Sequence, residues 1–176
     1  MMKRLLAASL FLTLVAGPGA RATTPDDAWV ARFIDKVTNP KVFEATQQTG
    51  PTYFGDVLHF VAVGHEACSR VFEAVEKWPT LTSTAMDFGD HESCASSPLQ
   101  DMSITLAGED APYVQPVLEA VGKKLGKPTL EHVDPKTNVA QANWGTRHRG
   151  IIVEYDAGNP RGFTLWVLGP GIPSRS

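Results

Sequence analysis

The chain has 176 residues, of which 43% are hydrophobic and 20% are charged, a composition typical of a globular protein with a core. Its nineteen Asp and Glu outnumber its sixteen Lys and Arg, and three of those bases lie within the first 22 residues, so the remainder carries a formal charge of −6. That sign argues against nonspecific nucleic-acid binding.

The first 22 residues have the pattern of a secretory signal peptide. Two basic residues precede an apolar run over residues 5–17, and Ala20 and Ala22 place small residues at −3 and −1 of a cleavage point. The run is too short to span a bilayer, and no second run of membrane length follows. We therefore expect cleavage after Ala22 and export to the periplasm of a Gram-negative bacterium, without a membrane span.

Cys68 and Cys94 are the two cysteines of the chain. In an exported protein a single pair is expected to form a disulfide bond. The bond would close a loop of about 26 residues, which the chain-entropy model values at roughly 3 kcal/mol. The alternative is a free or metal-bound thiolate pair, which export disfavours.

The first predicted element is a helix that begins near Thr24 and ends at Asn39. Thr24 can cap it, and its apolar residues recur on one face: Val30, Phe33, Ile34 and Val37. A polar loop is expected over residues 38–52, followed by a buried strand over residues 57–63.

Alternating periodicities predict the elements that follow. They are a helix over 66–78, a strand over 80–88, an acidic loop over 89–98, a strand over 102–107, a helix over 112–125 capped by Asp110, and a strand over 129–133. Three more strands, over 138–144, 150–156 and 162–168, form an antiparallel meander.

This order predicts an α+β fold in a single domain over residues 23–168, with a flexible tail over 169–176. The sheet is expected to be largely antiparallel with helices on one face. The first elements resemble a split βαβ repeat, and the C-terminal meander follows that repeat.

A short motif occurs twice, as His65-Glu66-Ala67-Cys68 and as His91-Glu92-Ser93-Cys94. A disulfide would hold the two Cα atoms about 5–6 Å apart and would bring two imidazoles and two carboxylates together. One hypothesis is therefore a zinc or copper site made by His65 and His91, aided by Glu66 or Glu92. A solvated acidic loop is favoured instead, because the spacing matches no established ligand motif.

Two patches are candidates for binding a protein partner. Trp144, Arg147, His148 and Arg149 lie around a predicted hairpin turn, and Arg and Trp are enriched at protein-interface hot spots. The acidic loop offers Asp90 and Glu92, with Asp87 beside them and Asp101 as a possible addition, for a basic partner. A solvated turn and a solvated loop are the alternatives.

Motifs of common enzymes are missing from the sequence: there is no G-x-S-x-G elbow, no P-loop and no dinucleotide fingerprint. We therefore expect a non-enzymatic binding protein without a cofactor, most concretely an inhibitor or immunity protein that occludes an envelope-targeting toxin or hydrolase. The alternatives are a divalent-metal-binding protein and an enzyme with an unfamiliar site.

Overall fold

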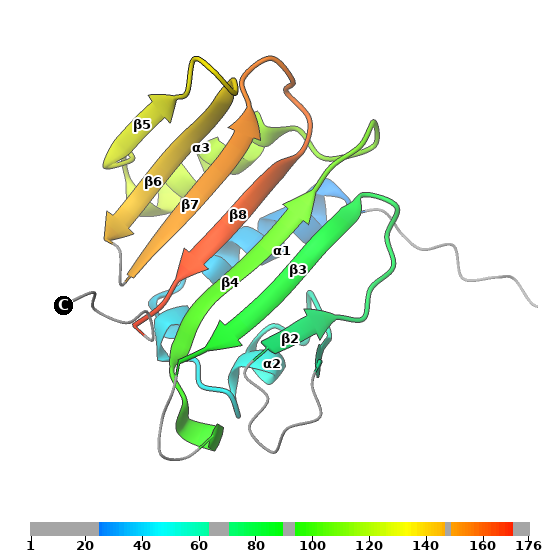
Figure 1. The fold of residues 1–176 in the computed structure, drawn as a ribbon, viewed down its shortest axis with the longest axis vertical. Helices are drawn as coiled ribbons and strands as arrows, with labels where there is room; N and C mark the ends of the chain where they lie inside the picture. Colours follow the sequence, from blue (N-terminus) through cyan, green and yellow to red (C-terminus); the bar gives the residue numbers. More distant parts are fainter. Residues whose placement is uncertain (1–24, 64–70, 90–93, 147–148, 171–176) are drawn as a thin grey trace, which may run out of the picture.

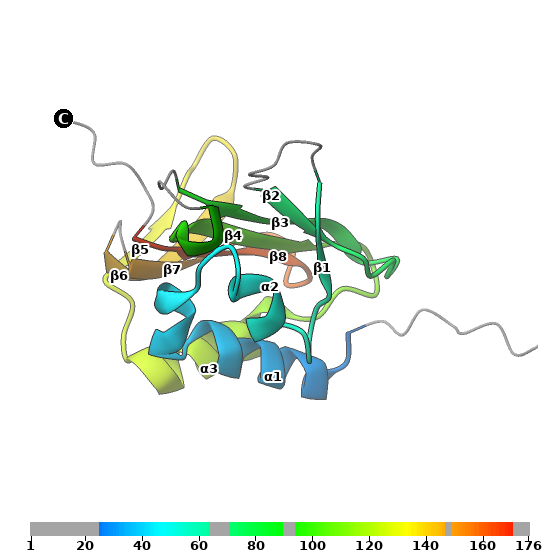
Figure 2. The same cartoon turned by 90° about the horizontal axis from the view of Figure 1, so that it is seen from below.

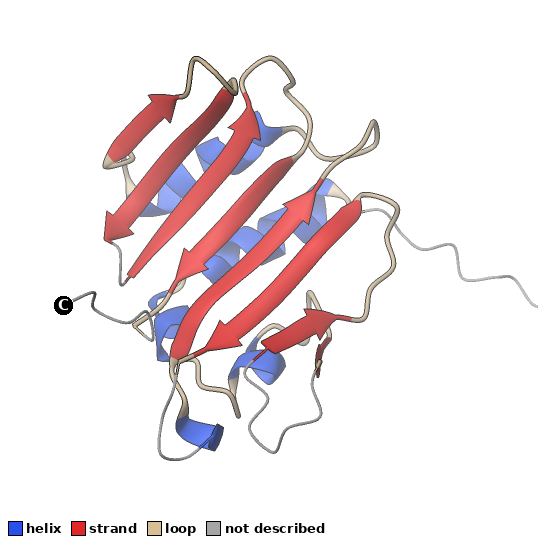
Figure 3. Cartoon of the chain, viewed as in Figure 1, coloured by secondary structure: helices blue, strands red, loops and turns tan. Residues whose placement is uncertain are grey.

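A computed structural model describes residues 25–63, 71–89, 94–146 and 149–170. Its main feature is one eight-stranded sheet in which every neighbouring pair is antiparallel, in the order β1-β2-β3-β4-β8-β7-β6-β5 (Figures 1 and 3). The strands are β1 Phe60–Ala62, β2 Val71–Ala74, β3 Leu81–Phe88, β4 Leu99–Leu106, β5 Leu130–Val133, β6 Val139–Thr146, β7 Arg149–Asp156 and β8 Phe163–Leu168. The fold is thus a single α+β domain, as predicted.

The helices cover one face of the sheet and leave the other face open (Figure 2). They are α1 Asp27–Val37, α2 Gly50–Tyr53 and α3 Val114–Leu125, with two 3-10 turns, η1 Pro40–Glu44 and η2 Cys94–Ser96. The hydrophobic core lies between the helices and the inward side of the strands. Burial of apolar area in this layer is the main source of stability.

The sheet has two halves that meet at the β4–β8 pair. Each half is a four-stranded antiparallel meander that follows a helix, and the halves run outward from the pair as 4-3-2-1 and 8-7-6-5. The inward side chains at this centre are all buried, namely Met102, Ile104, Leu106, Phe163, Leu165 and Val167. The two halves therefore share one core.

The helix layer does not repeat in the same way. Lys124 in the last turn of α3 forms an ion pair of 2.8 Å with Asp35 near the end of α1, so the two helices run in the same direction (Figure 1). In an alternating sheet of eight strands, however, β1 and β5 run in opposite directions. Only four residues lie between the end of α3 and the start of β5. In the first half, by contrast, the chain uses residues 38–59 to return from α1 to β1. We call residues 38–59 the return segment.

The return segment corrects the prediction of a polar loop over residues 38–52. It contains η1 and α2, and its side chains Val42, Phe54 and Leu58 are fully buried. The strand predicted over residues 57–63 is correspondingly shorter, because β1 begins only at Phe60. The spacing of apolar residues in a sequence does not distinguish a buried turn from a buried strand.

The helix predicted over residues 66–78 is wrong where the structure describes it. Residues 71–74 form β2, which pairs with β1 and β3, and Phe72 packs edge-on against Phe88 with ring centroids 5.6 Å apart. The apolar residues of this segment fit a period of two as well as a helical period. Pairing with the neighbouring strands therefore decides that the segment forms a strand and not a helix. With this helix absent, the split βαβ repeat is absent too.

Most other predicted elements agree with the structure, including the first helix, the strand over 80–88 and the C-terminal meander. Two caps differ. Asp26 rather than Thr24 caps α1, since its carboxylate accepts a hydrogen bond of 2.7 Å from the Trp29 amide. Tyr113 rather than Asp110 precedes α3.

Candidate binding surface

The open face of the sheet carries the side chains that point away from the helices. One row of this face crosses six strands from β6 to β2 and pairs neighbouring residues directly: Gly145, Gly150, Leu168, Asp101, Asp87 and Val71. This row lies at the end of the sheet where β1 joins β2, β3 joins β4 and β6 joins β7 (Figure 1). The described members of the two predicted patches, Asp87 and Asp101 of one and Trp144 and Arg149 of the other, therefore lie at the same end of the sheet.

Asp87 and Asp101 are direct partners across the β3–β4 pair. Like charges in this position destabilise a sheet. Within the described part of the chain, neither carboxylate lies within salt-bridge distance of a Lys, Arg or His. Burial, and then the neighbouring Asp87 carboxylate, raise the pKa of Asp101. Among the described residues, the pair is thus a half-buried negative site without a positive partner.

A hydrogen-bonded group of side chains lies next to this row on β6, β7 and β8. Glu154 accepts from the Trp166 indole at 3.0 Å through one carboxylate oxygen and from the Gln141 amide at 2.8 Å through the other. Gln141 in turn accepts from Asn143 at 3.4 Å. Because Trp166 is held by this bond and is only partly buried, an aromatic ring stays in a fixed position on the open face.

Trp144 was predicted as a partner-binding residue beside the exposed hairpin turn, but its side chain does not lie on the open face. Its side chain is 4% exposed and lies on the inward side of β6, where its indole donates a hydrogen bond of 2.9 Å to the Gly126 carbonyl. In a strand, successive side chains point to opposite faces, and Trp144 shares the inward parity of Ala140 and Ala142. The tryptophan belongs to the core.

Arg149 is exposed at the start of β7, but it is turned toward the helix layer. Its guanidinium carbon lies 5.9 Å from the centroid of the Phe43 ring on η1, within the range of a cation–π contact. Arg149 therefore lies at the same end of the sheet as Asp101, on the other side. Arg147 and His148, the other members of the predicted turn, lie outside the described residues.

Several other predicted residues also lie outside the described part of the chain. They are His65, Glu66, Cys68, Asp90, His91 and Glu92, together with the side chain of Cys94. The disulfide and the metal hypothesis thus stay predictions. Among the residues that the structure describes, no group of three or more His, Cys, Asp or Glu is arranged to hold a metal ion.

The sequence analysis missed Trp166 and Glu154. Their positions in the strands were predicted, and strict alternation would have placed both on the face opposite Leu165 and Val153. The pairing of β7 with β8, which brings side chains 12 residues apart into contact, depends on a register that the hairpin loop does not reveal.

The fold and the open face define a class of protein: a small α+β domain with a one-sided antiparallel sheet. No family model matches the chain, and no curated protein matches it. Among solved structures, the chain is similar to a DUF4309 family protein (YjgB) from Bacillus subtilis subsp. subtilis str. 168, with 12% identity, a TM-score of 0.38 and coverage of 80% of this chain and 99% of that chain. None of the described helices is long and apolar enough to cross a membrane.

Proposed function

We propose that this protein is an exported, non-enzymatic binding protein that acts by covering part of a protein partner. The most concrete form is an inhibitor or immunity protein directed against an envelope-targeting toxin or hydrolase. The observation that carries the proposal is the pairing of Asp87 with Asp101 on the open face without a positive partner among the described residues.

This acidic pair reduces the stability of the isolated sheet, and a basic group of a partner would remove that penalty. Charged pairs that become buried in an interface contribute strongly to which partner is accepted. The nearby Trp166, held by Glu154, supplies the kind of rigid aromatic side chain that dominates binding energy at interfaces. The acidic pair therefore favours a partner with a basic surface, and Trp166 supplies an aromatic contact beside it.

The size of the open face also fits this role. Six strands from β6 to β2 extend about 24 Å across the sheet, and an eight-residue strand is about 27 Å long. A standard protein–protein interface buries about 800 Å² on each partner. The open face is of comparable area, so one partner can cover it without rearrangement of the fold.

The proposal is tested by native mass spectrometry of the protein recovered gently from the envelope fraction of the producing cells. We expect a second protein to co-elute at fixed stoichiometry. A bare monomer, or a metal adduct without a protein partner, would overturn the proposal, and the metal adduct would direct attention to His65 and His91.

A further inference from the structure

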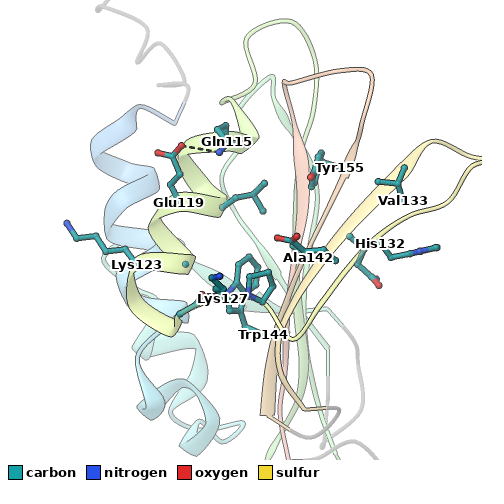
Figure 4. A pocket seen from close by; sticks show the side chains of 15 residues that line it. Gln115, Glu119, Lys123, Lys127, His132, Val133, Ala142, Trp144 and Tyr155 are labelled. Carbon is teal, nitrogen blue, oxygen red and sulfur yellow. Dashed lines mark hydrogen bonds between the residues drawn. The ribbon is translucent and has the colours of Figure 1, made fainter.

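A groove runs between α3 and the outer strands β5 and β6, on the helix side of the sheet (Figure 4). Its volume is about 810 Å³. Leu118 and Gly122 of α3 form one wall, Ala142 and Trp144 of β6 form the floor, and Val133 of β5 belongs to the other wall. The groove is therefore an open channel with apolar side chains at its base.

The other half of the sheet shows what such a space holds. There the return segment fills the region between α1 and the outer strands with a short helical turn. Phe54 and Leu58 are fully buried in it, and the Phe54 ring lies 6.4 Å from Phe33 on α1 and 6.1 Å from Phe60 on β1. The Trp29 indole adds a hydrogen bond of 2.8 Å to a carbonyl of the segment.

The second half has no counterpart to this segment, because only four residues connect α3 to β5. An apolar side chain of the groove wall stays exposed as a result: Val133 at 49%. A Cβ atom added at Gly122 would meet no atom within 4 Å. An amphipathic layer normally buries such surface, so the second half lacks one covering element among the residues that the structure describes.

Charged residues of both signs line the groove, with Glu119, Lys123 and Lys127 on the α3 side and Glu131 on β5. Neither lysine forms an ion pair with another described residue. An apolar floor between charged rims is the surface that accepts an amphipathic helix, whose apolar residues recur at i, i+3, i+4 and i+7.

We propose that this groove binds an amphipathic helical turn of another protein, which takes the place that the return segment occupies in the first half. The site lies on the opposite side of the sheet from the Asp87–Asp101 pair. The inference goes beyond the proposed function and does not depend on it.

The test is a selection of phage-displayed amphipathic helical peptides on the purified protein, followed by affinity measurements on two variants. Gly122→Leu fills the groove, and it is expected to fold because its Cβ has free space and leucine favours a helix over glycine. Gly122→Ala is the matched control, since it shares the gain in helix propensity but adds a single methyl group.

We expect the selected peptides to become helical when bound. Their affinities for the wild type and for Gly122→Ala should agree within about twofold. Their affinity for Gly122→Leu should be at least about tenfold lower, which corresponds to about 1.4 kcal/mol. Asp101→Asn should leave this binding unchanged, which separates it from the proposed function. Peptides that bind Gly122→Leu as tightly as the wild type, or that bind in an extended form along β5, would overturn the inference.

Discussion

At the scale of single residues, the fold disfavours the ionised form of Asp101. Its pKa is raised by burial and then by Asp87, so the native state binds the proton more tightly than the unfolded chain does. The resulting penalty is fully present above the raised pKa, and it is relieved as the pH falls through that pKa toward the unfolded value of about 3.9.

We therefore expect Asp101→Asn to stabilise the protein at neutral pH, by up to about 1 kcal/mol, the range for one opposed pair in a sheet. The difference from the wild type should disappear in acid, once Asp101 is protonated in both states. Urea unfolding at the two pH values measures this. Glu109→Gln, at an exposed position beyond the other end of β4, is the control and should change stability by less than about 0.5 kcal/mol. A destabilised Asp101→Asn at neutral pH would contradict the argument.

The two tryptophans of the C-terminal meander should behave in opposite ways. Trp144→Phe removes a buried indole and its hydrogen bond to Gly126, so we expect a loss of about 1–2 kcal/mol in the free energy of unfolding and no change in affinity for the partner of the open face. Trp166→Phe should cost less stability and weaken binding. Denaturation of both variants, and titration of each with the partner of the open face, test these expectations. An affinity for that partner that depends on Trp144 rather than on Trp166 would contradict them.

At the scale of elements, what the sequence predicts depends on whether a segment fits one period only. The helix α1 repeats its apolar residues at helical spacing, and β6, β7 and β8 alternate, so their types could be predicted. The segment that forms β2 fits both periods, and its identity comes from pairing with β1 and β3. The return segment could not be predicted either. The chain needs it because α1 and α3 run in the same direction while β1 and β5 run in opposite directions, and the sequence does not show these directions.

The return segment should contribute stability mainly through Phe54, which is fully buried between α1 and β1. We expect Phe54→Ala to lower the free energy of unfolding by about 3–5 kcal/mol. Phe43→Ala, in the same segment but only partly buried, should lower it by less than half as much. Chemical denaturation of both variants provides the measurement. Equal losses would mean that the segment packs as a unit without a central residue.

At the scale of the whole molecule, the two faces of the sheet carry different groups of residues. The helix side holds the core, including Trp144, and the open face carries Asp87, Asp101 and the ordered Trp166. The sequence could place these residues in strands and could mark an acidic region near Asp87. It could not show that Asp101 lies directly opposite Asp87 or that Trp144 is turned inward, because both depend on strand register. The candidate surface was therefore predicted only in part.

The central claim is that the acidic pair on the open face binds a protein partner. The most direct test is a calorimetric titration of the co-eluting partner into the wild type, Asp101→Asn and Glu109→Gln. Asp101→Asn, although more stable than the wild type, is expected to bind at least about tenfold more weakly, because the loss of one charge from a buried pair costs about 2 kcal/mol or more. Glu109→Gln is expected to bind as the wild type does. Equal affinities for all three proteins would contradict the central claim.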